Sequence, residues 1–359
     1  MIRGERIMAT KRKDVGRGMT IYDIAREAGV SGSTVSRVLA GVAGVSADKR
    51  ARVMRIVEKY NFRPNALARG LANAKSHVIG IVTADICNPY YGELFICCEK
   101  AARAAGYTLL LFNSESRERD SFFLEKLQEQ KVDGIIQIGG MVDDLITDMA
   151  YAEKVNQVMT TVPVIVAGKV EGTDCRMVRI DQAMTMELIM EYLLSLGHER
   201  IALVGGRMNV LSTYVKFMRY KQILRDNGIA FDPSLVAEDG GYRKESGYTL
   251  MNRMFDRGVV PTAVIAINEP AAAGVLQSIH EHDYKVPEDI SLVSYDNTYI
   301  AELLTPHLTS IDYDYENFGK KLVDTAVAVI EGKKVEMLQT VTPRLVIRDS
   351  CCPCRKTLR

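Results

Sequence analysis

Short apolar runs alternate with helical patterns from residue 77 to residue 350, and this alternation constrains the fold more than any other feature of the sequence. Apolar runs of this length are typical of buried strands, and the amphipathic segments between them are long enough for helices. Strands that alternate with helices pair in parallel through right-handed crossovers. Because the strands are too many for one comfortable sheet, we predict two α/β lobes with parallel sheets. The runs are VIGIVTADI, YTLLLFNS, DGIIQIGG, VPVIVAG, IALVGG, TAVIAIN and ISLVSYD.

Polar and aromatic residues follow several of these predicted strands. In open α/β sheets, ligands bind beyond the carboxyl ends of the strands. We therefore predict a hinged small-molecule site in a cleft between the lobes. For each residue taken singly, a strand-end cap or a core tyrosine is the ordinary alternative, and only the whole set favours a ligand site. The set is Asp85, Tyr90, Tyr91, Asp181, Asn268, Glu269, Asp296 and Asn297.

The charge of the first 76 residues is opposite to that of the rest of the chain. Residues 1–76 hold 16 Lys and Arg against 6 Asp and Glu, a net charge of +10, whereas the remainder holds 30 against 39, a net charge of −9. Such a basic segment favours a polyanionic partner. We expect residues 1–18, which show no periodicity, to be a disordered basic extension. From Thr20 onward the basic residues lie on predicted helices, which favours nucleic acid over a solvated tail.

Two short helices are predicted just after this extension. Thr20 and Asp23 have the spacing of a capping box at the start of the first helix, and Gly29 ends it. Ser31 is placed to cap the second helix. Helical geometry puts Val35, Val38 and Leu39 on one side of the second helix and Ser33, Ser36 and Arg37 on the other.

A third helix is predicted after Ser46, which is placed to cap it. Its expected inner residues are Val53, Ile56, Val57 and Tyr60, and its expected outer residues are Lys49, Arg50, Arg52 and Arg55. Three such helices can close a small core and present a helix-turn-helix with a basic rim to DNA.

The outer face of the second helix is small and rich in hydroxyl groups. An exposed helix of an ordinary bundle usually carries Glu and Lys, which favour helix formation and solubility. A helix that lies in the major groove instead needs side chains that contact base edges and phosphates at close range. The stretch GVSGSTVSRVLAG therefore favours a DNA-reading helix.

The segment TIYDIAREAGVSGSTVSRVLAG, continued by VSADKRARVMRIVEKYNFRPNALARGL, resembles the DNA-binding headpiece of the LacI/GalR family of bacterial transcription regulators. The resemblance continues in the family's order through IGIVTADICNPYYGEL, KVDGIIQIGG, LLSLGHERIALVGG, VPEDISLVSYDN and PRLVIRDS. It implies a helix-turn-helix domain at 19–63, a hinge helix and linker at 64–76, a two-lobed periplasmic-binding-protein-like domain at 77–350, and a tail at 351–359.

The resemblance assigns DNA contacts to residues of the headpiece and of the hinge. Ser33 and Arg37 match base-reading positions, whereas Gly32 offers no side chain at another such position. Leu71 matches an apolar residue that wedges into the minor groove, where unstacking the bases is offset by extra contacts. The assigned residues are Thr20, Tyr22, Ser31, Gly32, Ser33, Thr34, Ser36 and Arg37 in the headpiece, and Asn65, Ala68, Arg69 and Leu71 in the hinge.

The resemblance also implies a small-molecule effector, a sugar or sugar derivative, between the lobes. Tyrosine rings suit the apolar face of a sugar, and carboxylates and amides suit its hydroxyl groups. The matching positions are Tyr90, Tyr91, Asp181, Lys216, Tyr242, Asn268, Glu269 and Asp296.

Four positions depart from the family's usual pattern. Lys216 stands where an arginine is usual, and lysine keeps the charge but loses the planar bidentate fork. Arg219 and Ser294 each stand where a glycine is usual, and Glu269 replaces an aspartate. We therefore expect a ligand that differs from common ones.

Enzyme and metal motifs find little support in the sequence. It contains no GxxxxGK[ST], HExxH or GxSxG, and no GxGxxG after a strand, so we predict neither catalysis nor a cofactor. The seven cysteines are odd in number, which favours reduced thiols. The motif CCPC at Cys351, Cys352 and Cys354 lacks metal-ligand spacing, and we expect surface thiols at a frayed terminus.

No apolar run reaches the length of a membrane span, and no secretory leader is indicated, so we expect a cytoplasmic protein with no membrane partner. No leucine heptad follows PRLVIRDS, which favours a homodimer. We predict a sequence-specific regulator, a repressor, that binds double-stranded operator DNA under control of the effector. The alternative is a stand-alone ligand-binding protein or enzyme on the same scaffold, which would need no basic headpiece.

Overall fold

The computed structural model of the protein describes residues 19–39, 41–62, 75–238 and 241–355. The chain divides into two compact units, Met1–Ser76 and His77–Arg359. Among the described residues, the N-terminal unit has one hydrophobic core and the C-terminal unit has three.

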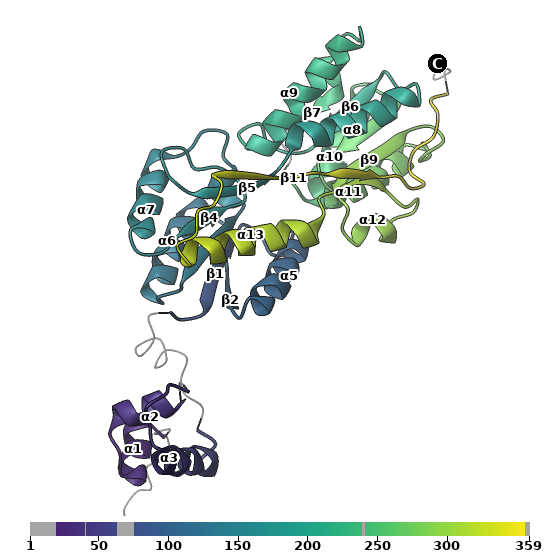
Figure 1. Cartoon of the computed structure of the whole chain (residues 1–359). Coiled ribbons are helices and arrows are strands. Elements are labelled where there is room, and N and C mark those ends of the chain that lie inside the picture. The colour runs from purple at the N-terminus through teal and green to yellow at the C-terminus, as the bar shows by residue number, and fades with distance from the viewer. Residues whose placement is uncertain (1–18, 40, 63–74, 239–240, 356–359) are drawn as a thin grey trace, which may run out of the picture. The chain divides into compact units, whose positions relative to one another are not determined.

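The described part of the N-terminal unit consists of three helices, α1 (Ile21–Ala28), α2 (Gly32–Leu39) and α3 (Ala47–Lys59) (Figure 1). The capping box is confirmed, because Thr20 N–H donates to Asp23 Oδ2 at 3.0 Å and Asp23 N–H donates to Thr20 Oγ1 at 3.3 Å. Gly29 ends α1 with φ 65°, a conformation that costs glycine little. The core is Ile24, Ala25, Ala28, Val35, Val38, Val53 and Ile56.

The end of α3 differs from the prediction. The sequence places Tyr60 on the inner side of this helix, but the side chain is 42% exposed. The reason is that α3 ends at Lys59, so Tyr60 leaves the helical periodicity. Its hydroxyl donates to Glu27 at 3.4 Å, and the Lys59 ammonium lies 2.8 Å from the same carboxylate. Ser46 occupies the predicted N-cap of α3, but its side chain makes no capping hydrogen bond.

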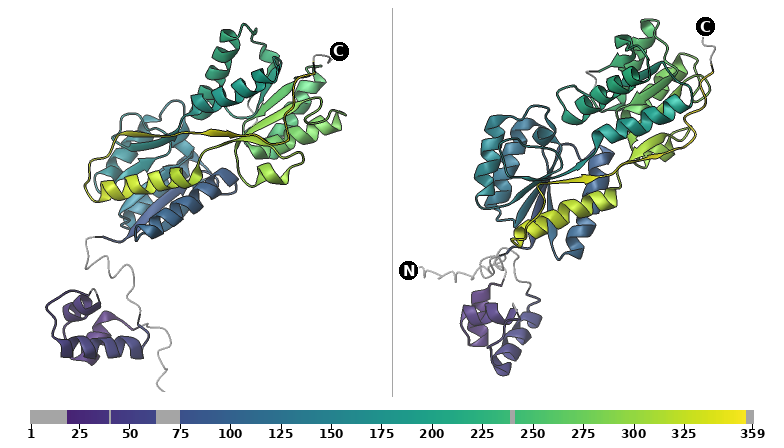
Figure 2. Two further views of the ribbon diagram at one scale, coloured as in Figure 1. Left: turned by 45° about the vertical axis from the view of Figure 1, so that its right-hand side comes forward. Right: turned by 45° about the horizontal axis from the view of Figure 1, so that its top comes forward.

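The C-terminal unit contains two six-stranded sheets, one in each lobe, which confirms the predicted α/β class (Figures 1 and 2). The first sheet consists of β1 (Val78–Thr83), β2 (Thr108–Asn113), β3 (Gly134–Ile138), β4 (Val164–Val166), β5 (Arg176–Ile180) and β11 (Leu338–Val341). The second sheet consists of β6 (Ile201–Val204), β7 (Val236–Ala237), β8 (Ala263–Ala266), β9 (Ser291–Asp296), β10 (Thr309–Asp312) and β12 (Arg344–Val346). Their orders are β11-β5-β4-β3-β1-β2 and β12-β10-β9-β8-β6-β7, and among the described pairings only that of β10 with β12 is antiparallel.

Helices cover both faces of each sheet (Figure 2). The helices of the first lobe are α5 (Pro89–Ala104), α6 (Arg117–Glu129), α7 (Met149–Met159) and α13 (Tyr315–Ile330), with the short 3₁₀ helix η1 (Gly140–Asp143). The helices of the second lobe are α8 (Gln182–Ser195), α9 (Leu211–Asp226), α10 (Lys244–Asp256), α11 (Glu269–Glu281) and α12 (Ile300–Leu303), with the 3₁₀ helix η2 (Pro233–Leu235). A Cβ at Gly319 of α13 would lie 2.8 Å from atoms of Cys97 in α5, so these two helices pack closely.

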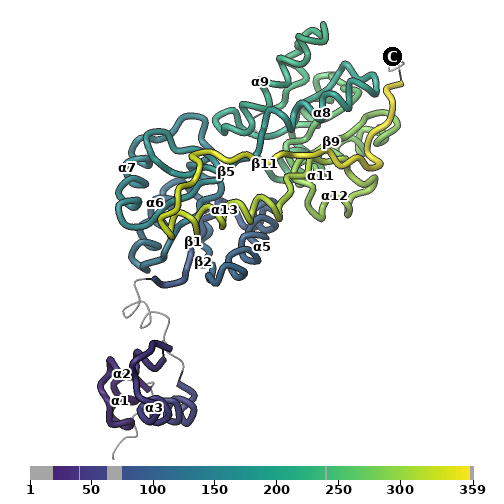
Figure 3. The backbone as a smooth tube through the Cα atoms, viewed as in Figure 1, coloured from purple at the N-terminus to yellow at the C-terminus, as the bar shows by residue number. Residues whose placement is uncertain are grey.

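Within the described part of this unit, the chain passes between the lobes three times (Figure 3). The first passage is at Asp181, between β5 and α8. The second is at Tyr313–Asp314, between β10 and α13, and the third is at Thr342–Pro343, between β11 and β12. Connections of this kind are suited to hinge motion of the two lobes.

The segment after β12 is docked, and the expectation of a frayed terminus is wrong for residues up to 354. Leu292 N–H donates to the Ser350 carbonyl at 2.8 Å, so the segment pairs beside β9. Further along, Cys352 N–H donates to Ser291 Oγ at 3.1 Å, and Cys354 N–H donates to the Leu196 carbonyl at 2.8 Å. The backbone of this segment therefore fills hydrogen-bonding positions that the lobe offers.

Candidate functional site

The second helix of the headpiece presents small polar side chains from its first turn. Ser31 caps α2 as predicted, since Thr34 N–H donates to Ser31 Oγ at 3.2 Å. The Ser31 and Ser33 hydroxyl oxygens lie 2.8 Å apart. Ser31, Ser33 and Arg37 are exposed, whereas Thr34 and Ser36 are half-buried. The face that the sequence assigns to DNA is therefore at the surface, and its polar groups bond chiefly to one another.

Arg37 holds the loop between α2 and α3. Its Nη2 donates to the Ala43 carbonyl at 3.1 Å, and Arg50 makes a similar bond to the neighbouring Val42 carbonyl at 2.9 Å. Both side chains are partnered by backbone carbonyls, and no carboxylate is bonded to either among the described residues. Their positive charges remain available to a polyanion.

Gly32 lies against the ring of Tyr22, which is 77% exposed. A Cβ at Gly32 would lie 3.5 Å from a ring carbon of Tyr22, which is an ordinary van der Waals contact. Glycine is therefore not required at this position by packing, and Tyr22 remains accessible beside it. The predicted hinge residues Asn65, Ala68, Arg69 and Leu71 lie outside the described residues, and their roles stay predictions.

The carboxyl ends of the two sheets meet where the lobes touch. Arg243 Nη2 of the second lobe lies 3.6 Å from Asp85 Oδ2 of the first. Leu145 N–H donates to the Asn209 carbonyl at 2.8 Å, and an isolated antiparallel bridge joins the residues beside them. The rings of Tyr90 and Tyr313 lie 5.9 Å apart. Residues from both lobes thus form a group that we call the interlobe cluster: Tyr90, Tyr91, Asp143, Lys216, Tyr242, Tyr295, Asp296, Tyr313 and Tyr315.

Four tyrosines of the interlobe cluster pack their rings together. Tyr90 contacts Tyr91 at 5.0 Å between ring centroids and Tyr315 at 6.0 Å, besides Tyr313. Tyr91 packs against Gly139, which has φ 78° and no room for a side chain on that face. Burial raises the pKa of Tyr90 and of Tyr91, and the nearby Asp143 carboxyl raises both further. These hydroxyls therefore stay protonated and can donate hydrogen bonds.

Lys216 and Asp296 form the charged centre of the interlobe cluster. Both side chains are buried, and the Lys216 ammonium lies 3.6 Å from the centroid of the Tyr295 ring. Burial lowers the pKa of Lys216, and the charge of Asp296 opposes that shift. Burial raises the pKa of Asp296, and Lys216 and a hydrogen bond from Tyr313 oppose it. Among the described residues the ammonium has no hydrogen-bond acceptor, so its N–H groups can donate to a ligand.

Asn268 and Glu269 begin α11 and are both engaged within the second lobe. Asn268 caps α11 by accepting from Ala271 N–H at 2.9 Å, and its Nδ2 donates to the Tyr242 carbonyl at 2.9 Å. Glu269 is fully buried and accepts from Thr298 and Ser310. Asn268 therefore anchors the segment that carries Tyr242, and Glu269 faces the interior rather than the surface.

Tyr242 joins the interlobe cluster from the segment before α10. Its hydroxyl lies 3.2 Å from Thr213 Oγ1 on α9, and the guanidinium of Arg207 lies 5.8 Å from its ring centroid. Burial raises the pKa of the Tyr242 hydroxyl. The predicted covering tyrosine is thus held between α9 and the loop that follows β6.

Sequence reasoning missed four residues of the interlobe cluster, namely Asp143, Tyr295, Tyr313 and Tyr315. Burial raises the pKa of Asp143 to about 7, and the carboxyls of Asp144 and Asp120 raise it too. Tyr313 and Tyr315 follow β10, and the Tyr315 hydroxyl is buried without a hydrogen-bond partner among the described residues. Position could have identified all four, since Tyr295 lies at the carboxyl end of β9 and the other three follow the carboxyl end of a strand.

Asp181 is the predicted effector residue that the structure places apart. Its side chain is exposed and caps α8, accepting from Met184 N–H at 3.0 Å. It lies on the first passage between the lobes, and no contact joins it to the interlobe cluster among the described residues. A role in effector binding stays a prediction for this residue.

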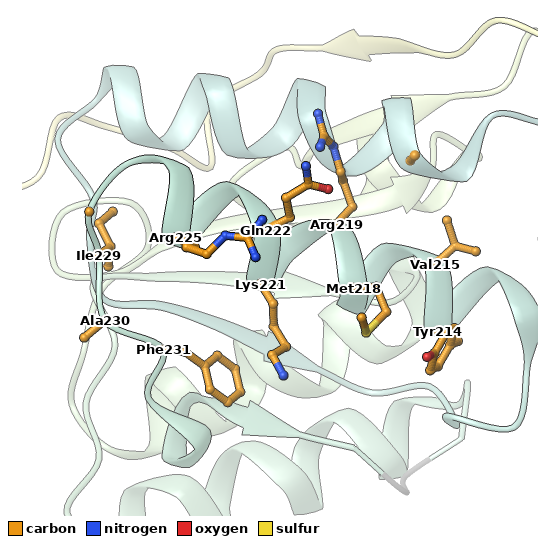
Figure 4. Close-up of a pocket in the computed structure, with 12 residues that line it drawn as sticks. Tyr214, Val215, Met218, Arg219, Lys221, Gln222, Arg225, Ile229, Ala230 and Phe231 are labelled. Atoms are coloured by element: carbon orange, nitrogen blue, oxygen red, sulfur yellow. The ribbon is translucent and has the colours of Figure 1, made fainter.

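An open groove of about 890 Å³ runs along α9 (Figure 4). Arg219, which stands where the resembled family has glycine, forms an ion pair with Glu187 of α8, with 2.7 Å between Nε and Oε1. The Lys221 ammonium lies 4.9 Å from the centroid of the Phe231 ring. None of the predicted effector residues lines this groove, so it is separate from the interlobe cluster. Its other lining residues include Tyr214, Met218, Gln222, Arg225 and Ile229.

Comparisons with known proteins agree with this architecture. Residues 20–65 match the family model "Bacterial regulatory proteins, lacI family", and residues 190–351 match a periplasmic binding protein-like domain. The catabolite control protein A of Priestia megaterium is 32% identical over 296 residues, which are 82% of this chain and 87% of that protein. The lac repressor dimer bound to operator and the anti-inducer ONPF has a TM-score of 0.83 at 27% identity, covering 94% of this chain and all of that chain.

A further solved structure, a LacI family transcriptional regulator from Enterococcus faecium with bound ribose, has a TM-score of 0.68 at 25% identity, covering 77% of this chain and all of that chain. The chain belongs to the LacI family of bacterial regulatory proteins. It is a DNA-binding transcriptional regulator, and the matched relatives are regulators rather than enzymes. Among the described residues, no helix is both long and apolar enough to cross a bilayer, and no cluster of His, Cys, Asp or Glu is placed to hold a metal ion.

Proposed function

We propose that this regulator is a homodimeric repressor that binds a near-palindromic operator and responds to a carbohydrate bound at the interlobe cluster. It acts in the cytoplasm. Helix α2 reads the operator through Ser33 and Arg37, and Leu71 of the 64–76 hinge wedges into the minor groove. The helix-turn-helix domain is residues 19–63, and the effector domain is residues 77–350.

The observation that carries the ligand class is the composition of the interlobe cluster. Tyrosine rings lie beside two buried groups of opposite charge, Lys216 and Asp296. The N–H groups of the Lys216 ammonium have no acceptor among the described residues and can donate to a ligand. Such a site combines apolar faces with convergent hydrogen-bonding groups, which suits a polyhydroxyl ring. A related regulator with bound ribose supports this class.

The effector acts by differential binding to two arrangements of the lobes. A ligand held by Tyr90 of the first lobe and Asp296 of the second favours one interlobe angle over another. By linkage, the ligand then changes operator affinity by the ratio of its affinities for the two states.

The proposal is tested on the full-length protein. Duplex DNA selected from a random pool should contain an inverted repeat and should be released as salt rises.

A thermal-shift screen with sugars should find ligands that raise the melting temperature, because binding to the folded state alone stabilises it. Those sugars should also change operator affinity. A ligand response confined to nucleobases, or selected DNA without symmetry, would contradict the proposal.

Leu71→Ala tests the wedge in the same assay. We expect strongly weakened binding to the selected duplex with an unchanged dimer on gel filtration. Equal operator affinity in the variant and the wild type would exclude the wedge role.

A further inference from the structure

Glu269 lies directly beneath the turn that follows β9. Its side chain is fully buried at the start of α11. Oε1 and Oε2 accept from the Thr298 backbone N–H at 3.1 and 3.0 Å, and the Thr298 hydroxyl also donates to Oε2. The Ser310 hydroxyl donates to Oε1 at 3.0 Å. Both carboxylate oxygens are therefore used to hold neighbouring segments of the second lobe.

The turn held by Glu269 has an unusual backbone conformation. Asp296 has φ 94° and Asn297 has φ 48°, a region that side chains other than glycine rarely adopt. Such a conformation persists only where the surroundings fix it. Here the turn is held by the hydrogen bonds from Thr298 to Glu269. A further hydrogen bond runs from Asn297 N–H to Ser310 Oγ at 3.1 Å.

Two departures from the resembled family's pattern meet in this network. Ser294, where glycine is usual, donates its hydroxyl to Ser310 Oγ at 3.1 Å, and Ser310 donates onward to Glu269. Glu269 itself replaces an aspartate. Because one chain of hydrogen bonds joins the two positions, a change at either one alters the bonding of the other.

The surroundings of Glu269 are consistent with a role in hydrogen bonding. No cation is bonded to it among the described residues. Burial raises its pKa to about 8, and the charge of Asp296 raises it too, while the bonds from Thr298 and Ser310 oppose the shift. In either protonation state its contribution is therefore to hydrogen-bond the turn, not to balance a positive charge.

We propose that Glu269 is a positioning residue that holds the Asp296–Asn297 turn, through Thr298 and Ser310, in the conformation that presents the Asp296 carboxylate to the effector. This inference rests on the proposed effector site. The substitution of Glu for Asp, together with Ser294, thus tunes the site without contacting the ligand.

Hydrogen–deuterium exchange of the full-length protein, without any sugar, tests the positioning role. Glu269→Gln keeps the shape of the side chain but turns one acceptor into a donor that faces other donors. Ser310→Ala removes the link to Asn297 and Ser294. We expect both variants to exchange the amides of residues 296–300 about 10-fold faster than the wild type, as for loss of one to two hydrogen bonds.

Ser350→Ala is the matched control. Ser350 is equally buried and also joins β9 to β10, donating to the Leu292 carbonyl at 2.5 Å and accepting from Thr309 N–H at 2.9 Å. It should lower the melting temperature without accelerating exchange at residues 296–300. Wild-type exchange at this turn in Glu269→Gln and Ser310→Ala would overturn the proposal, as would equal acceleration in Ser350→Ala.

A second readout separates this inference from the proposed function. With the sugar that most raises the wild-type melting temperature, Glu269→Gln should bind about 10-fold more weakly while operator affinity without sugar stays unchanged. Undiminished sugar affinity would overturn the positioning role and leave the effector site standing. If no sugar stabilises the wild type, the proposed ligand class fails, and exchange at the turn still decides whether Glu269 holds it.

Discussion

The DNA-reading helix and the interlobe cluster place their functional side chains in opposite environments. On α2, Ser33 and Arg37 are exposed around a core of seven small and medium side chains. In the interlobe cluster, Lys216 and Asp296 are buried in contact with tyrosine rings. Exposed polar groups keep their hydration and so cost little folding free energy. A buried charge loses its hydration, and a nearby opposite charge offsets part of that loss. Changes in the cluster should therefore alter both stability and response, and changes on α2 should alter DNA binding alone.

Asp296→Ala should produce the largest effect. It removes the charge that opposes the burial of the Lys216 ammonium and the acceptor of the Tyr313 hydroxyl, which should lower the free energy of unfolding by about 3 kcal/mol. The effector response should be lost while residual operator binding is retained. Urea unfolding and operator titrations with and without sugar measure the two effects.

The double variant Asp296→Ala with Lys216→Met is the control for Asp296→Ala. It removes both charges, so most of the stability should return while the response stays absent. A normal response in the single variant would refute the assignment of Asp296 to the effector site.

Arg37→Ala should weaken operator binding by about 1–3 kcal/mol, the usual discrimination of a base-reading pair. Arg50→Ala is the matched variant, because Arg50 holds the adjacent carbonyl of the same loop. If Arg37 reads bases, only its loss should reduce the ratio of operator to random-DNA affinity. Equal ratios in both variants would show that Arg37 serves the loop instead. Fluorescence anisotropy with both duplexes supplies the measurement.

Asp143→Asn should change the pH dependence of stability. The folded pKa of Asp143 is raised to about 7 by burial, so the folded state keeps a proton that the unfolded state releases from about pH 4. Stability contributed by the protonated group is therefore lost as pH rises from about 4 to about 7. In the variant, the free energy of unfolding should fall less steeply between about pH 4 and about pH 7, by about 1.4 kcal/mol per pH unit. Urea unfolding at pH 5, 6 and 7 measures it, and an unchanged slope would contradict the buried environment.

Gly32→Ala should have the smallest effect. The added methyl meets the Tyr22 ring at an ordinary distance, and helix propensity favours alanine by at most about 1 kcal/mol. The free energy of unfolding should change by about 0.5 kcal/mol or less, the usual range of a surface substitution. Operator affinity should change little, because the methyl group removes no polar group from the DNA-reading face. In a saturation scan of the operator, the base pair facing residue 32 should tolerate change best. A strong preference at that base pair in the wild type would show that the backbone or Tyr22 reads it.

Much of the fold could be predicted because its signals are local. The capping box at Thr20 and Asp23 depends on residues three apart, and the confirmed strands β1 and β8 are short apolar runs. Strand β5 was not predicted, because it is only partly buried and carries arginine at its first and fourth positions, so it does not form an apolar run. It becomes a strand by pairing with β11, more than 150 residues later in the chain.

The sequence by itself determined the helix-turn-helix, the seven apolar strands of the α/β lobes and most polar positions at the strand ends, because these follow from periodicity and short-range caps. Only the tertiary structure decided which of those residues meet. It brought Asp143 to Tyr91 and Tyr315 to Asp296, and it left Asp181 at a helix cap. It also placed Glu269 against the Asp296 turn and docked Cys352 against β9. Such contacts join residues far apart in the chain, and burial, which sets their charges and partners, exists only once both lobes have formed.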